Sequence, residues 1–164
     1  MVRFPLAKGT ASAAPVICFE DVFPGVAREH AALGVDFLLE FTNDGWFGEG
    51  AGQWQHLAAA LFRAVENGTP VVRCTNNGIT CWVDANGRIR EIFGEDAGRY
   101  YASGSQIVKV QLGAGEWPTF YRKYGDLFGS FCWVIAGLFT FRKVRETRSN
   151  AGNDPSFTDS PVVV

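Results

Sequence analysis

The sequence predicts an α/β fold with a mixed sheet, followed by one C-terminal transmembrane helix. Three observations support this prediction. Apolar runs of strand length alternate with helical segments in the first half of the chain. Short β-like segments follow, with a strong hairpin turn at Asn86-Gly87. A long uncharged apolar run then lies near the C-terminus.

The first half of the chain reads as strand, helix, strand and helix. The expected elements are strands at 15–18 and 35–41 and helices at 26–33 and 53–67. Gly34 and Gly68 follow the two helices, where glycine commonly ends a helix. A glycine-rich loop, residues 43–52, precedes the second helix. Further strands are expected at 70–75, 79–84, 88–93 and 106–111.

The apolar run at 125–141 has no charge after Asp126. A transmembrane helix needs about 20 mostly apolar residues, with a range from about 17. A core helix should show a polar stripe, and this run offers only Ser130, Cys132 and Thr140. The basic residues that follow at once are Arg142, Lys143, Arg145 and Arg148. By the positive-inside rule they place the C-terminus in the cytoplasm and the preceding domain on the other side.

We therefore expect four regions. They are an irregular N-terminal segment at 1–14, an α/β domain at 15–119, a transmembrane helix at 120–142, and a basic then disordered tail at 143–164. The chain has 164 residues, 47% of them hydrophobic and 20% charged, which suits a globular domain with a real core. The net charge of -2 gives no reason to expect a nucleic acid partner.

The four cysteines do not form a metal-binding pattern. No CxxC pair occurs and no histidine lies at ligand spacing, so we expect no metal. For Cys74 and Cys81, buried and inert thiols are the preferred interpretation. Cys18 differs because it ends a strand just before a helix, where the positive helix dipole would lower a thiol pKa. From this spacing alone, a buried structural cysteine remains an alternative to a nucleophile.

Sequence motifs around Cys18 resemble those of a known superfamily. Val16-Ile-Cys-Phe-Glu-Asp-Val-Phe-Pro24, with Arg28 shortly after, resembles the nucleophile strand of the nitrilase, or carbon–nitrogen hydrolase, superfamily. Further segments resemble the apolipoprotein N-acyltransferases: Phe41-Thr-Asn-Asp-Gly-Trp-Phe-Gly48, Gln55-His56, Arg63-Ala-Val-Glu66, Pro70, and Arg73-Cys-Thr-Asn-Asn-Gly78. Asp126 opens a terminal hydrophobic helix, as in that family. The resemblance covers about residues 15–142 and implies part of a nitrilase-type αββα sandwich.

The resemblance implies a two-step acyl transfer without a cofactor. Cys18 would be the nucleophile that takes an acyl chain from a phospholipid as a thioester. The N-terminal amine of an apolipoprotein would then accept the chain. The implied location is the bacterial inner membrane, with the catalytic domain on the periplasmic side.

Four further residues are candidates for supporting roles. Glu20 matches an acid that the family places two residues after the nucleophile, and an N-terminal helix acid is an equal alternative. Phe19, Trp46 and Phe47 are candidates for binding substrate, the latter two on a glycine-hinged loop. A loop pinned by a buried aromatic ring is the alternative. For His56 we expect packing or helix capping.

The resemblance also implies a Glu–Lys–Cys catalytic triad, and the sequence departs from this pattern. Only 17 residues precede Cys18, none of them acidic, and Lys8 lies too close to Cys18 for the family's spacing. We therefore expect a C-terminal fragment that is inactive alone. Two alternatives stay open: a carbon–nitrogen hydrolase (amidase) acting on a small amide, and a non-catalytic, membrane-tethered remnant.

Overall fold

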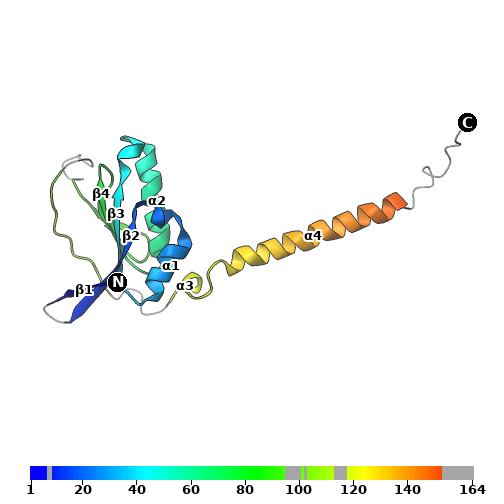
Figure 1. Ribbon diagram of the computed structural model, residues 1–164, viewed down its shortest axis with the longest axis horizontal. Coiled ribbons are helices and arrows are strands. Elements are labelled where there is room, and N and C mark those ends of the chain that lie inside the picture. Colours follow the sequence, from blue (N-terminus) through cyan, green and yellow to red (C-terminus); the bar gives the residue numbers. More distant parts are fainter. Residues whose placement is uncertain (7–8, 95–100, 102, 113–117, 153–164) are drawn as a thin grey trace, which may run out of the picture. The chain divides into compact units, whose positions relative to one another are not determined.

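The computed structural model describes residues 1–6, 9–94, 101, 103–112 and 118–152. The chain divides into two units, Met1–Gly125 and Asp126–Val164. The first unit contains a six-stranded sheet whose spatial order follows the chain from β1 to β6. Figure 1 labels strands β1 to β4 of this sheet. Its strands are β1 (Val2–Pro5), β2 (Thr10–Ile17), β3 (Phe37–Asn43), β4 (Val71–Asn76), β5 (Cys81–Val83) and β6 (Ile89–Ile92). Its helices are η1 (Cys18–Val22), α1 (Pro24–Ala32), η2 (Asp44–Phe47), α2 (Ala51–Asn67) and α3 (Phe120–Tyr124).

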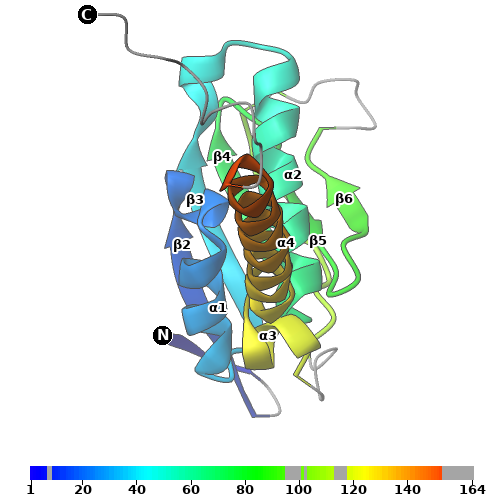
Figure 2. The same ribbon diagram turned by 90° about the vertical axis from the view of Figure 1, so that its right-hand side faces the viewer.

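The central strands β2, β3 and β4 are parallel, and the outer pairs are antiparallel. Helix α1 connects β2 to β3, and helix α2 connects β3 to β4. Crossover connections between parallel strands are right-handed. When the strands are adjacent in sequential order, both connecting helices therefore lie on the same face of the sheet. Figure 2 shows α1 and α2 side by side over one face of the sheet.

The core lies between this face and the two helices. Small residues on the helices, including Ala27, Ala60 and Ala64, are fully buried and let the helices approach the sheet closely. Leu38 of β3 and Leu57 of α2 fill the space between them. At about 25 cal/mol per Å² of buried apolar surface, a leucine side chain contributes roughly 1.5–3 kcal/mol.

The opposite face of the sheet is less covered. Alternate residues of β3 on that face are half-buried or exposed, and Phe41 is 45% exposed. The described first unit therefore consists of one helical layer on one mixed sheet. The expected fold class, an α/β fold of nitrilase type forming part of a sandwich, is confirmed.

Three details differ from the sequence-based expectation. The described part of segment 1–14, expected to be irregular, contains β1 and the start of β2, which pair antiparallel. No strand forms at 106–111 within the described residues. Cys74 is exposed, although Cys81 is buried as expected. The β1 pairing is a tertiary contact that local pattern does not encode, and the 106–111 segment has no strand partner in the described part of the sheet.

The second unit contains α4 (Leu127–Gly152), a single continuous helix. The expected helix at 120–142 is thus divided between α3 and α4, with Gly125 at the break in a positive-φ conformation. Residues Leu127–Arg148 are long and apolar enough to cross a membrane, with a mean hydropathy of 1.4. The helix also continues through 143–152, part of the expected disordered tail, and the rest of that tail lies outside the described residues.

Candidate active site

The candidate site lies where the parallel strands end. Ile17, Asn43 and Asn76 are the last residues of β2, β3 and β4, so the residues that follow them gather at one edge of the sheet. Ligands of open parallel sheets bind at this carboxyl edge. Cys18 is the first residue beyond β2.

Cys18 has a left-handed backbone conformation with a φ of 51°. A non-glycine residue in this region is uncommon and costs about 1–3 kcal/mol, so the surrounding structure must hold it there. Such outliers cluster at active sites. The predicted position of Cys18, at the end of a strand under a tight turn, is confirmed.

The pKa of Cys18 lies below the ordinary thiol value. A hydrogen bond from the Thr42 side chain is the largest cause, and a backbone hydrogen bond from Asn43 adds to it. The positive charge of His56 acts in the same direction. The sequence predicted that Cys18 lies at the N-terminus of a helix whose dipole lowers the thiol pKa. Instead, Cys18 opens a five-residue 3-10 turn, and the helix α1 begins only at Pro24.

The turn η1 is fixed by long-range contacts at its far end. The side chain of Asp21 is buried, although Cys18 and Glu20 in the same turn are not. Arg63 of α2 donates to the backbone oxygen of Asp21 at 2.9 Å and to that of Val22 at 3.3 Å. The same guanidinium forms a bidentate pair with Glu66. Helix α2 therefore anchors the turn that presents Cys18.

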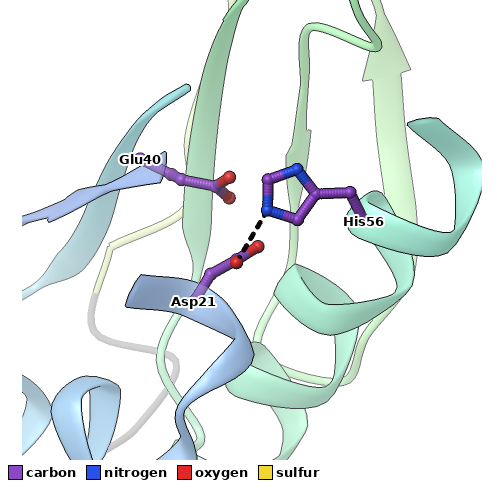
Figure 3. A group of neighbouring side chains, drawn as sticks. All are labelled: Asp21, Glu40 and His56. Atoms are coloured by element: carbon purple, nitrogen blue, oxygen red, sulfur yellow. Dashed lines mark hydrogen bonds and ion pairs between the residues drawn. The ribbon is translucent and has the colours of Figure 1, made fainter. Parts of the chain in front are cut away.

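His56, on α2, is the centre of a buried polar network. Its Nε2 lies 2.9 Å from Asp21 Oδ1, and its Nδ1 lies 2.7 Å from Asp44 Oδ1. Each carboxylate can only accept, so both ring nitrogens must carry protons and the ring is an imidazolium. The hydrogen bonds that His56 donates to Asp21 and Asp44 raise its pKa to about 9, against the opposing effect of burial. Figure 3 shows the carboxyl groups of Asp21 and Glu40 pointing toward the ring, with the hydrogen bond to Asp21 dashed.

Arg73 of β4 supplies the second buried cation. Its guanidinium binds Glu40, lies 3.4 Å from Asp21 Oδ2 and lies 2.7 Å from Asp44 Oδ2. Burial raises the pKa of Glu40 to about 8, so this carboxyl is largely protonated at neutral pH. Two carboxylates, Asp21 and Asp44, then balance the charges of Arg73 and His56.

A metal ion does not suit this cluster, although Asp21, Glu40 and His56 bring one potential ligand atom each within 4.8 Å of one another. Both imidazole nitrogens already donate to carboxylates and offer no free lone pair. The Arg73 guanidinium bonds to both carboxyl groups and holds the positive charge there. The donor set thus favours a fixed ion-pair network over a cation site.

The residues predicted to support Cys18 lie on the exposed side of this network. Glu20 Oε2 accepts a hydrogen bond from the backbone N–H of Ile17 at 2.8 Å, which fixes the chain just before Cys18. Phe19 and Phe47 both contact the His56 ring, with centroid separations of 6.1 and 5.8 Å. Trp46 is 87% exposed and does not pin its loop through burial.

Sequence reasoning missed the buried network and assigned His56 only a packing or capping role. A signal was present in the strand periodicity. Glu40 lies two residues after Leu38 on β3, and Arg73 lies two residues after Val71 on β4, so each charged residue shares the core face with an apolar one. A charge at a core position requires a buried partner. That requirement would have directed attention to Asp21, Asp44 and His56.

Comparison with known proteins places this chain in a family. The carbon–nitrogen hydrolase family model matches residues 4–112, and the chain belongs to that family. Apolipoprotein N-acyltransferase of Geobacter metallireducens is 36% identical over 132 residues, which cover 78% of this chain and 24% of the relative. Apolipoprotein N-acyltransferase of Shewanella oneidensis is 51% identical over 76 residues, covering 46% of this chain and 15% of the relative. The predicted resemblance is confirmed, and the chain spans about a quarter or less of the length of these relatives.

A carbon–nitrogen hydrolase of Helicobacter pylori G27 has a similar fold in a solved structure, with 18% identity and a TM-score of 0.42. The matched region covers 49% of this chain and 35% of that protein.

Proposed function

We propose that this chain carries the nucleophilic half of an N-acyltransferase of lipoprotein maturation, with Cys18 as nucleophile. The observation that carries the proposal is a strained cysteine at the carboxyl edge of the sheet, with a lowered thiol pKa and exposed aromatic residues beside it. The similarity to enzymes named apolipoprotein N-acyltransferase supports the choice of reaction.

The proposed chemistry has two balanced steps. The Cys18 thiolate attacks an ester carbonyl of a phospholipid, and the C–O bond to the glycerol oxygen breaks. A lysophospholipid leaves with a proton, and the acyl chain remains on the sulfur as a thioester. The α-amine of an apolipoprotein then attacks the thioester carbonyl, loses a proton and forms an amide. The thiolate is regenerated.

Phe19, Trp46 and Phe47 are proposed to contact the acyl chain. Phe19 directly follows the nucleophile, and Phe47 contacts the same imidazole ring as Phe19, which places both aromatic rings around His56. These three side chains are 54%, 87% and 46% exposed. An exposed aromatic group of this kind would gain free energy by covering an aliphatic chain.

The membrane setting is proposed from α4. The helix is long and apolar enough to span a bilayer, and basic residues follow its apolar part. By the positive-inside rule, the C-terminus then lies in the cytoplasm and the sheet unit on the periplasmic side of a bacterial inner membrane.

A chimera provides the test. The 132-residue segment of the Geobacter relative that aligns with this chain is replaced by the matching residues of this chain. The purified chimera is incubated in phospholipid vesicles with a lipopeptide whose N-terminal cysteine has a free α-amine. We expect one added acyl group on that amine by mass spectrometry. Cys18→Ala should abolish the transfer, and Cys74→Ala, which removes an exposed thiol on β4, should preserve it.

The same chimera distinguishes the alternatives. Release of ammonia from a small amide, without acylation of the lipopeptide, would identify an amidase instead. A membrane-inserted, folded chimera that forms no Cys18 thioester and no product would support a non-catalytic remnant. Either result contradicts the proposal.

A further inference from the structure

The proposed site is divided between two short turns. Turn η1 carries Cys18 and Phe19, and turn η2 carries Trp46 and Phe47. The two turns follow the neighbouring parallel strands β2 and β3. An acyl chain that contacts aromatic residues of both turns while its carbonyl reaches Cys18 requires the turns to keep a fixed spacing.

A buried carboxylate in each turn contacts the same imidazole ring. Asp21 is the buried residue of η1, and Asp44 is the buried residue of η2. His56 Nε2 lies 2.9 Å from Asp21 Oδ1, and His56 Nδ1 lies 2.7 Å from Asp44 Oδ1. The ring also contacts Phe19 of η1 and Phe47 of η2. One side chain of α2 therefore contacts a buried acid and an aromatic ring in both turns.

We propose that His56 is a positioning residue that holds η1 and η2 at a fixed spacing, so that the aromatic rings of both turns stay in place beside Cys18. An imidazolium suits this role because its two N–H groups lie on different sides of one rigid ring and can donate to two separate segments. The purpose of the link rests on the proposed acyl transfer, but the link itself is a property of the fold and can be measured without turnover.

The two turns depend on His56 to different degrees. The charged groups that face the ring come from four elements: Asp21 of η1, Asp44 of η2, Glu40 of β3 and Arg73 of β4. Asp44 is bound by His56, Arg73 and the Thr42 hydroxyl. In η1, Arg63 of α2 also donates to two backbone oxygens. Turn η1 therefore keeps a second anchor on α2 when the ring changes.

Loss of one proton from His56 should loosen η2 first. Arg73 Nη2 lies 3.2 Å from His56 Nδ1, so a neutral ring can accept that hydrogen at Nδ1 and keep its remaining proton on Nε2 for Asp21. The Nδ1 lone pair would then face Asp44 Oδ1, and repulsion would replace a charge-assisted hydrogen bond. Because the pKa of His56 is raised to about 9, the link to η2 is present below this pH and is lost above it.

Hydrogen–deuterium exchange of the full chain in detergent micelles measures the opening of each turn, with quench-flow labelling and peptide mass spectrometry. The Phe23 N–H is hydrogen-bonded at 3.1 Å to a backbone oxygen of η1, and the Gly48 N–H at 3.4 Å to one of η2. The Gly87 N–H, bonded at 2.9 Å in the turn between β5 and β6, reports on the rest of the sheet unit. Each rate is divided by that of the unstructured peptide, which removes the direct effect of pH on exchange.

Two variants are compared with the unaltered chain. His56→Phe keeps a ring and removes both donors, and at neutral pH it should raise the exchange of both turns about tenfold while Gly87 stays unchanged. Gln53→Met is the matched control, because Gln53 is buried on the same helix and donates to Asn77 instead of to either turn. Unchanged exchange in either turn of a His56→Phe chain that still protects Gly87 would overturn the proposal, as would equal effects of the two variants.

A pH series changes only a proton on the ring. In the unaltered chain, the η2 amide should exchange about tenfold faster above about pH 9 while the η1 amide stays protected, and His56→Phe should lack this step. A step that persists in His56→Phe would overturn the proposal. If His56→Phe exposes Gly87 at neutral pH, the unaltered chain decides: a step confined to η2 supports the link, and a step that is missing or shared with Gly87 overturns it. A chimera that fails to transfer acyl chains would contradict the proposed function without altering this result.

Discussion

Gly78 lies directly against the buried carboxylate of Asp44, and a methyl group on this glycine would sit 2.5 Å from Asp44 Oδ2. Asp44 is fully buried and binds both His56 and Arg73, so it has no free volume to move into. The absence of a side chain at residue 78 is thus a requirement of the network and not of backbone conformation.

Gly78→Ala should consequently destabilise the fold. An overpacked buried site costs about 1–3 kcal/mol, and displaced Asp44 would also lose part of its ion pairing. The free energy of unfolding in urea measures this loss. Gly25→Ala is the matched control, since its new methyl group would meet nothing within 4 Å and lies in a helix. Equal stability of the two variants would contradict the tight contact.

Stability should fall as the pH rises above neutrality. The pKa of His56 is raised from 6.5 to about 9, so its stabilising contribution is complete below pH 6.5 and is lost by about pH 9. The pKa of Glu40 is raised from 4.5 to about 8, so the folded state retains a proton that the unfolded state releases above pH 4.5. Between pH 6.5 and about 8, both groups therefore make the folded state bind more protons than the unfolded state does. Each extra proton lowers the unfolding free energy by about 1.4 kcal/mol per pH unit.

Urea titrations across this pH window test the prediction, with Glu40→Gln as the control. The amide cannot ionise, so this variant should lose about half of the pH dependence and keep the part that belongs to His56. Unfolding free energies that increase from pH 6.5 to about 8 would show that the network is not held by these two protons.

Trp46→Ala should weaken phospholipid use without affecting stability. The side chain is 87% exposed, so its removal leaves no cavity. Loss of an aromatic contact with the acyl chain, worth about 1.5–3 kcal/mol, should raise KM for the phospholipid at least tenfold in the chimera. Phe62→Ala removes another exposed aromatic residue, on α2, and should leave KM unchanged. Equal effects of the two variants would argue against a specific acyl contact.

Helix α4 should retain the chain in membranes after alkaline carbonate washing. Its apolar side chains, such as Trp133 and Phe139, are 81% and 71% exposed. Ile135→Arg places a charge near the middle of the span, at a cost of about 2.5–3.5 kcal/mol, and should reduce retention. Ile135→Leu should not. Release of the unaltered chain into the soluble fraction would exclude a spanning helix.

The local pattern of the sequence predicted the order of the parallel strands and their helices. Gly34 and Gly68 have positive φ values of 74° and 61°, so both helix ends follow from residues that tolerate this conformation. The α4 helix was predictable because an uncharged run of that length has few alternatives.

Long-range partners were harder to predict. On α2 the apolar residue Val65 is 48% exposed, whereas the polar residues Gln53 and His56 are buried. Polar residues on a buried helix face can be recognised only when their partners on other elements are known. Here Asp21, Asp44 and Arg73 come from three different elements, separated from His56 by 12 to 35 positions in the chain.

Competitive alkylation at neutral pH tests the central claim that the fold activates Cys18 as a nucleophile. Cys74 is exposed and Cys18 only partly so, which means that exposure alone favours Cys74. The thiolate fraction, however, controls reactivity, and hydrogen bonding by Thr42 lowers the pKa of Cys18. With limiting iodoacetamide and peptide mass spectrometry, we predict that Cys18 is labelled before Cys74. Labelling that follows exposure, with Cys74 first and Cys18 at the rate of an ordinary thiol, would contradict the claim.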